Sequence, residues 1–132
     1  MSQITEHIHS LPWLDQIDPE RLRRVRVILT DVDDTLTWQS GLPEVCFQAL
    51  HRFAEAGIQV IPVTGGCAGW ADMMARVWPV AGVIAEGGAC FMQKDRQGIL
   101  QYHFWQEGEA MRRAQQALLQ EVKRLLPGFA PL

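Results

Sequence analysis

Lysine and cysteine are scarce in this 132-residue chain, and long apolar runs are absent. The three cysteines form no CxxC pair, which argues against a zinc site and favours free thiols in a reducing compartment. No apolar stretch is long enough to cross a bilayer, and residues 1–7 lack the basic start and apolar core of a secretory signal. We therefore expect a cytoplasmic protein with no membrane partner.

Positive charge is also limited. Twelve lysines and arginines stand against fifteen acidic residues, a formal net charge of −3. Proteins that bind nucleic acid by neutralising its phosphates normally carry a basic excess, so we expect no nucleic-acid partner. A small phosphorylated substrate remains compatible with this balance, because a bound divalent cation can supply positive charge locally. The length and the apolar fraction of 48% are ordinary for one globular domain.

One stretch concentrates the chemistry that is present. An apolar run, residues 25–30, ends in a carboxylate cluster formed by Asp31, Asp33 and Asp34. Clustered carboxylates at a strand end repel one another, a cost that a bound cation or a reaction usually offsets. Residues two apart in an extended segment point to the same side, so Asp31 and Asp33 can face one substrate. The alternative is an acidic turn that only caps a helix.

The rest of the chain predicts an α/β fold with a Rossmann-like parallel sheet. Strands and helices alternate, which favours parallel strands joined by right-handed crossovers. We expect them at residues 25–30, 43–56, 58–63, 68–77 and 82–85. The inner side of the helix at 68–77 is predicted to carry Trp70, Met73, Met74 and Val77. Ligands bind beyond the carboxyl ends of such strands, where Asp31, Asp33 and Thr64 fall.

The segments before and after this sheet in the sequence suggest that the chain has three parts. Residues 1–24 are an N-terminal extension, in which Asp18 and Pro19 are good first residues for a short helix. Residues 25–88 form the core, and 89–132 begin a further unit. That unit consists of a strand hairpin, 90–93 and 99–105, and a long amphipathic helix, 107–126. The apolar face of this helix comprises Met111, Ala114, Leu118, Val122 and Leu125.

The segment Asp31-Val32-Asp33-Asp34-Thr35-Leu36 resembles the first motif of the haloacid dehalogenase (HAD) phosphatases, Asp-x-Asp-x-Thr/Val-Leu/Val. Thr64 resembles the second motif, a lone Ser or Thr at the end of the next strand. Val63-Thr64-Gly65 together with residues 84–89 resembles the large-capped sugar-phosphatase branch, such as mannosyl-3-phosphoglycerate and sucrose-phosphate phosphatases. Gly66 and Gly87 stand where that branch usually has Arg and Asn. The resemblance implies a HAD-like core half followed by the start of an α/β cap.

The residues favour phosphoryl-transfer chemistry, and the resemblance implies a phosphomonoester hydrolase that acts on a small, sugar-type phosphate. The resemblance implies Asp31 as nucleophile and Mg²⁺ ligand, and Asp33 as acid/base and second ligand to the Mg²⁺ cofactor. Thr64 and Gly65 would bind the phosphoryl group. Thus Asp31 and Asp33 are the predicted catalytic and metal residues.

The resemblance also implies further site residues that this sequence does not contain. A lysine from a later strand and further acidic metal ligands are expected, but the lysines are Lys94 and Lys123 and no Asp follows Asp95. We therefore expect feeble activity from this chain alone. The family's first strand is central in its sheet, whereas here it would be an exposed apolar edge, covered by a second copy or by a C-terminal half. The alternatives are a non-catalytic remnant or interaction module of the same fold, or an uncapped small phosphatase in which Lys94 reaches the site.

Overall fold

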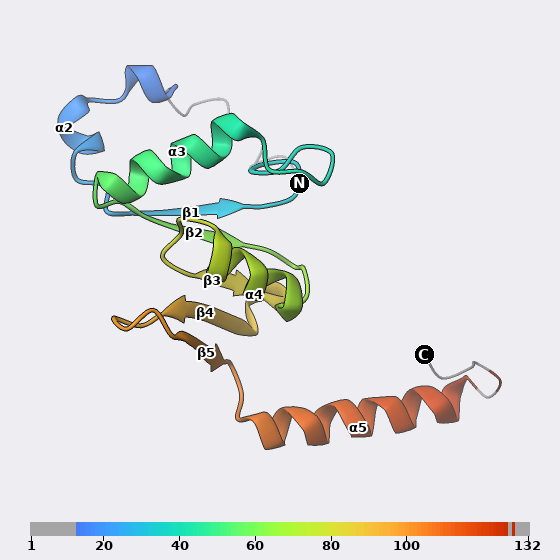
Figure 1. Ribbon diagram of the computed structural model, residues 1–132. Helices are drawn as coiled ribbons and strands as arrows, with labels where there is room; N and C mark the ends of the chain where they lie inside the picture. The colour runs from blue at the N-terminus through green and yellow to red at the C-terminus, as the bar shows by residue number, and fades with distance from the viewer. Residues whose placement is uncertain (1–12, 127, 129–132) are drawn as a thin grey trace.

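The computed structural model describes residues 13–126 and 128 and shows one five-stranded sheet with helices packed on it (Figure 1). Residues 1–12 of the predicted N-terminal extension, including the stretch examined for a signal, lie outside the described part. The elements are η1 (Leu14–Gln16), α2 (Pro19–Leu22), β1 (Val27–Asp31), α3 (Glu44–Glu55), β2 (Gln59–Val63), α4 (Ala68–Val77), β3 (Val83–Ala85), η2 (Glu86–Gly88), β4 (Cys90–Lys94), β5 (Leu100–Phe104) and α5 (Gly108–Leu125). This order confirms the predicted α/β, Rossmann-like class.

The sheet is mixed, with the strand order β1-β2-β3-β4-β5. β1 pairs with β2 and β2 with β3 in parallel, whereas β4 is antiparallel to both β3 and β5. The predicted hairpin is present as β4 and β5, and it extends the same sheet as the first three strands. The predicted boundary between residues 25–88 and 89–132 thus falls within one continuous sheet, and a division into core and cap stays a prediction.

Proline in β2 explains why its pairing with β3 is short. Ala81 N–H donates to the Val60 carbonyl at 2.9 Å, and Thr64 N–H donates to the Ile84 carbonyl at 2.9 Å. Pro62 lies between these two bonds and has no N–H to donate. A proline is tolerated in a strand where its nitrogen needs no partner. Pro62 lies inside β2, opposite Thr30 of β1, and is fully buried.

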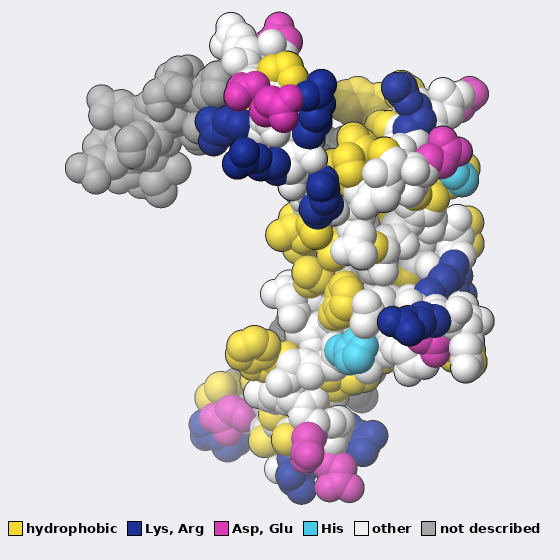
Figure 2. Space-filling model, turned by 90° about the vertical axis from the view of Figure 1, so that its left-hand side faces the viewer, with side chains coloured by type: hydrophobic (Ala, Val, Ile, Leu, Met, Phe, Trp, Pro, Cys, Tyr) yellow, Lys and Arg dark blue, Asp and Glu magenta, His cyan; other side chains and the backbone are white. Residues whose placement is uncertain are grey.

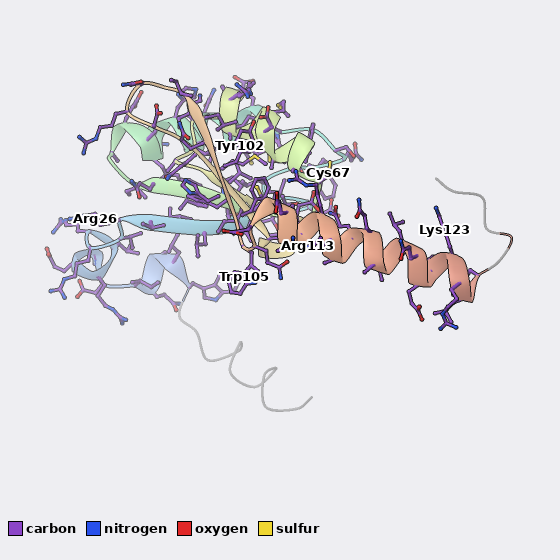
Figure 3. All side chains as sticks on the ribbon, turned by 90° about the horizontal axis from the view of Figure 1, so that it is seen from below. Arg26, Cys67, Tyr102, Trp105, Arg113 and Lys123 are labelled. Carbon is purple, nitrogen blue, oxygen red and sulfur yellow. The ribbon has the colours of Figure 1, made fainter. Side chains whose placement is uncertain are left out.

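Helices α3 and α4 cover one face of the sheet (Figures 1 and 3). Burial alternates along the strands beneath them, as expected when one face of each strand is covered. On α4 the buried residues include Met74, whereas Trp70 is 42% and Val77 62% exposed, so their predicted inward position is wrong. The buried core comprises Val32, Leu50, Val60, Ala71, Met74, Ala75, Trp78, Val83, Ala85, Cys90 and Met92.

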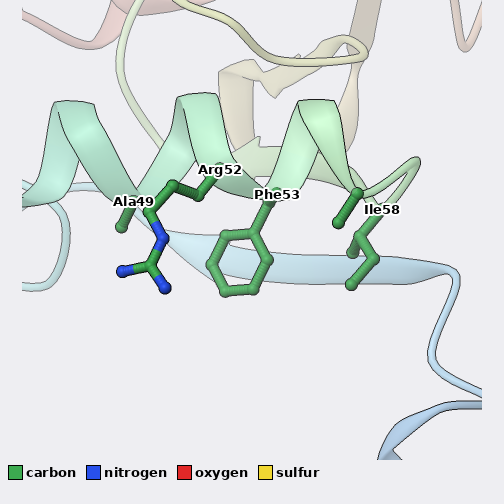
Figure 4. Close-up of a pocket in the computed structure, with 5 residues that line it drawn as sticks. Ala49, Arg52, Phe53 and Ile58 are labelled. Carbon is green, nitrogen blue, oxygen red and sulfur yellow. The ribbon is translucent and has the colours of Figure 1, made fainter.

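β1 is an edge strand and, within the described residues, pairs with β2 alone. Its outward side chains are Val27 and Leu29, which are 46% and 64% exposed. An open hollow of about 340 Å³ lies beside α3, lined by apolar side chains including Phe53 and Ile58 and by Arg52 (Figure 4). The unpaired edge of β1 thus exposes apolar side chains, as the sequence predicted.

The long helix α5 has the predicted amphipathic pattern, but nothing in the described part of the chain covers its apolar face. None of its residues is buried, and Leu118 and Leu125 are 65% and 60% exposed. The helix projects away from the sheet, with Lys123 near its far end (Figure 3). No helix in residues 13–126 is long and apolar enough to span a membrane.

Polar contacts join α4 to the last two strands. The Asp72 carboxylate accepts hydrogen bonds from Arg76 Nε at 2.7 Å and from the Tyr102 hydroxyl of β5. Lys94 Nζ, at the end of β4, donates to the Arg76 carbonyl at 2.7 Å. The bond from Arg76, and after it the bond from Tyr102, lowers the pKa of Asp72.

Replacing Tyr102 with phenylalanine is expected to raise the pKa of Asp72 while leaving it below the ordinary value, because Arg76 remains. A carboxylate with a lowered folded-state pKa stabilises the fold above its unfolded pKa, and this is lost as pH falls through the folded value. The acid-side loss of stability therefore begins at higher pH in Tyr102→Phe. NMR titration of the carboxyl carbon measures the pKa. Arg76→Gln should give the larger rise, and an unchanged pKa in Tyr102→Phe would contradict this assignment.

Candidate active site at the carboxyl ends of β1 and β2

The carboxylate segment leaves β1 through a tight turn. Val32 is fully buried, and its carbonyl accepts from the amides of Leu36 and Thr37 at 3.0 and 2.9 Å. It also accepts from the Thr37 hydroxyl at 3.0 Å, so one backbone oxygen organises the whole turn. Asp31 and Asp33, on either side of Val32, are exposed. Both carboxylates thus lie away from the core, and that they face one substrate stays a prediction.

Threonine and aspartate side chains complete this turn. The Thr35 hydroxyl donates to Asp31 Oδ2 at 3.3 Å. Asp34 has a φ of +56°, the left-handed conformation that Asp tolerates better than most residues with a Cβ. Asp34 therefore suits the backbone conformation of the turn, and its side chain is exposed like those of Asp31 and Asp33.

A small hairpin follows the carboxylate segment. Trp38 and Gly41 exchange backbone hydrogen bonds of 2.8 and 3.0 Å, and form an antiparallel bridge. Gln39 and Ser40 at its tip both have positive φ, the pattern of a type I′ turn. Neither is the glycine, asparagine or aspartate that usually signals this turn, so sequence patterns gave little indication of the hairpin.

The second part of the site is the loop between β2 and α4. Thr64 is 3% exposed, and its hydroxyl oxygen accepts from the Gly66 N–H at 2.9 Å. This leaves the hydroxyl proton of Thr64 available as a donor. Within the described residues no hydrogen bond uses the Gly65 N–H. Gly65, the predicted phosphate-binding glycine, therefore retains a donor, while that of Gly66 is already engaged.

Sheet register places the two parts side by side. Asp31 is the parallel partner of Val63, the residue before Thr64. The carboxylate that ends β1 and the hydroxyl that follows β2 thus occur at neighbouring strand ends, where ligands bind in open α/β sheets. The catalytic, metal-binding and phosphate-binding roles of these residues stay predictions.

The donors present fit Mg²⁺ in kind. Within the part of the chain that the structure describes, no three His, Cys, Asp or Glu side chains gather around one point. Mg²⁺ requires fewer, because it prefers oxygen, keeps several waters and is commonly held by one or two carboxylates. Asp31 and Asp33 are therefore the residues that would hold it, with water and substrate oxygens as the further ligands.

Lys94 lies far from these carboxylates in the topology of the sheet. β4 runs antiparallel to β3. Lys94, at the end of β4, therefore lies near the amino ends of the parallel strands, whereas Asp31 and Thr64 lie at their carboxyl ends. Its ammonium group instead binds the Arg76 carbonyl, in the last turn of α4. The reading as an uncapped phosphatase in which Lys94 reaches the site therefore loses its support.

Sequence patterns missed Glu86. Glu86 was not among the predicted site residues, but its Oε1 accepts from the Ala68 N–H at 2.7 Å, next to the Thr64 loop. The contact joins residues 18 apart, so no local pattern could have indicated it.

A comparison with solved structures finds similarity to a phosphatase of the haloalkanoate (HAD) enzyme superfamily from Bacteroides thetaiotaomicron. The TM-score is 0.53 and the sequence identity is 25%. The match covers 83% of this chain and 38% of that chain, so this chain spans less than two fifths of the phosphatase. No family model and no curated protein matches the sequence. The similarity supports a HAD-like fold at the level of the superfamily.

Proposed function

We propose that this chain carries the nucleophile half of a Mg²⁺-dependent phosphomonoester hydrolase that acts on small, sugar-type phosphates. The observation that carries the proposal is the register of β1 and β2, which sets Asp31 against the residue before Thr64. The structural similarity to a HAD phosphatase supports the reaction class. The sugar-phosphate class rests on the resemblance of the residues around Thr64 and Glu86 to the capped branch.

The reaction proceeds in two displacements. A carboxylate oxygen of Asp31 attacks phosphorus, and the bond to the leaving oxygen breaks as protonated Asp33 gives that oxygen a proton. Water then attacks phosphorus of the aspartyl-phosphate, Asp33 takes the proton from water, and the bond to Asp31 breaks. The Thr64 hydroxyl and the Gly65 N–H donate to phosphoryl oxygens throughout. A bound Mg²⁺ supplies charge neutralisation between the phosphoryl group and Asp31.

Formation of the aspartyl-phosphate in the 132-residue chain tests this proposal. Incubation with acetyl phosphate and Mg²⁺ is expected to add one phosphoryl group, detected by intact mass, and chelation by EDTA is expected to prevent it. Turnover of p-nitrophenyl phosphate is expected to be slow, because Lys94 lies at the other end of the strands and binds the Arg76 carbonyl. Absence of any adduct would favour a non-catalytic remnant of the fold. Rapid turnover would show that Asp31, Asp33 and Thr64 suffice.

We also propose that the edge of β1 binds a further strand, from a second copy or from a later part of a longer chain. Exposed arginines lie where α2 leads into β1, and Lys and Arg side chains gather in this upper region of Figure 2. Antiparallel pairing of two β1 strands would set Arg24 and Arg26 of one copy near Asp31 and Asp33 of the other. This charge complementarity favours the second copy when the chain is studied alone.

Substituting Leu29 with lysine is expected to shift the chain from dimer to monomer, because it adds a charge to the outward face of the edge strand. Sedimentation velocity at several concentrations measures the change. Leu118→Lys is the matched control, since Leu118 is exposed to nearly the same degree, 65% against 64%, but lies on α5. Loss of the dimer in the control alone would place the contact on α5. A monomeric parent chain would contradict pairing with a second copy and favour pairing of β1 with a later segment of a longer chain.

A further inference from the structure

Glu86 has a backbone conformation that is costly for a residue with a Cβ. Its φ is +54°, in the left-handed region. Gly87 and Gly88 follow with φ of +64° and +101°, which glycine adopts readily. A glycine at position 86 would remove the strain, but it would also remove the carboxylate. The strained backbone therefore points to a role for the Glu86 side chain.

Glu86 contacts the Thr64 loop through both its backbone and its side chain. Its N–H donates to the Gly66 carbonyl at 3.0 Å, and its Oε1 accepts from the Ala68 N–H at 2.7 Å. The Gly87 N–H adds a longer bond of 3.4 Å to the Thr64 carbonyl. Residues 64–68 are thus attached at both ends to the segment that follows β3.

The side-chain bond replaces a local helix cap. Ala68 is the first residue of α4, where backbone N–H groups lack partners within the helix. Cys67 occupies the N-cap position and makes no side-chain cap bond. Glu86 supplies the acceptor instead, and so fixes the point at which the loop becomes helix.

The loop has little freedom to adjust if that point moves. A Cβ built on Gly66 would meet the Thr64 hydroxyl oxygen at 3.1 Å and the Trp70 ring at 3.6 Å. A shift at the start of α4 would therefore change how the Thr64 hydroxyl and Gly65 N–H are aimed.

We propose that Glu86 is a positioning residue, whose Oε1 holds the start of α4 and thereby aims the Thr64 hydroxyl and the Gly65 N–H at a phosphoryl group. The ligand in this proposal rests on the proposed function, whereas the hold on the loop does not. The hold on Ala68 needs only an acceptor oxygen. The negative charge of Glu86 does not help to bind a phosphoryl group, because like charges repel.

Two substitutions in the full chain separate these requirements. Glu86→Ala removes the acceptor and Glu86→Gln keeps it without the charge, while Glu55→Ala removes an exposed carboxylate at the end of α3 as a control. Hydrogen exchange of the Ala68 amide reports the loop. NMR shifts of the Gly65 amide on addition of inorganic phosphate with Mg²⁺ report binding.

In Glu86→Ala we expect Ala68 exchange to accelerate and phosphate affinity to fall, each by about tenfold, as for one lost hydrogen bond to a backbone amide. Amides of β4 are expected to keep their exchange rates, which separates a local change from general destabilisation. Glu86→Gln and Glu55→Ala are expected to stay within about threefold of the parent chain, since neither removes this acceptor.

The proposal is overturned if Glu86→Ala changes neither quantity, if it tightens phosphate binding, or if Glu86→Gln behaves like Glu86→Ala. A parent chain that binds no phosphate, with Ala68 exchange still accelerated in Glu86→Ala, would contradict the proposed function and support the hold of Glu86 on the loop.

Discussion

In Asp31→Asn, the phosphoryl adduct formed from acetyl phosphate is expected to fall at least about a hundredfold, to background. The amide oxygen of asparagine is a poor nucleophile, and the substitution preserves size, so the buried position of Val32 beside it is undisturbed. Intact mass spectrometry gives the amount of adduct, and peptide mapping of the parent chain gives its position. Asp34→Asn is the matched control, because asparagine tolerates the positive φ of Asp34 and that side chain has no proposed role.

Asp33→Asn is expected to lengthen the lifetime of the adduct rather than to prevent its formation. Acetate leaves acetyl phosphate without needing a proton, so the adduct still forms on Asp31. Its hydrolysis slows because Asp33 no longer takes the proton from water, an effect of about a hundredfold for a general base. An adduct that survives in Asp31→Asn, or one that decays equally fast in Asp33→Asn, would contradict the assigned roles.

Local patterns were sufficient where the interactions are local. Asp18 caps α2 through a 3.0 Å bond from the Glu20 N–H, with Pro19 as the first helical residue, as predicted. The run that ends at Asp31 is a strand, and Thr64 follows the next one. Hydrogen-bonded caps, strand propensity and the spacing of two carboxylates are all encoded within a few residues.

Some features that depend on partners distant in the sequence were not predicted. The apolar stripe of α5 has the same periodicity as one that packs, yet none of it is buried, because periodicity cannot show whether a covering surface exists. Lys94 follows the predicted strand 90–93, and only the antiparallel direction of β4 reveals that it lies at the other end of the strands from Asp31. The cap on Ala68 comes from Glu86 across 18 residues.

Leu50→Ala is expected to lower the free energy of unfolding by about 2–5 kcal/mol, which is the range for a leucine removed from a closed core. Leu50 lies on α3, is 2% exposed and belongs to the cluster that includes Val60 and Met74. Its loss leaves a cavity between α3 and the sheet. Urea unfolding followed by circular dichroism measures the change, with an unchanged denaturant slope as the sign of a true stability effect.

Leu118→Ala removes the same atoms from α5 and serves as the control. Leu118 is 65% exposed, so its truncation is expected to change the free energy of unfolding by no more than about 0.5 kcal/mol. A small effect at Leu50 would mean that α3 is not firmly packed on β2 and that the neighbouring strand ends are loosely held. Because Asp31 and Thr64 are aligned only through β1 and β2, that result would also remove the structural basis for placing them in one site.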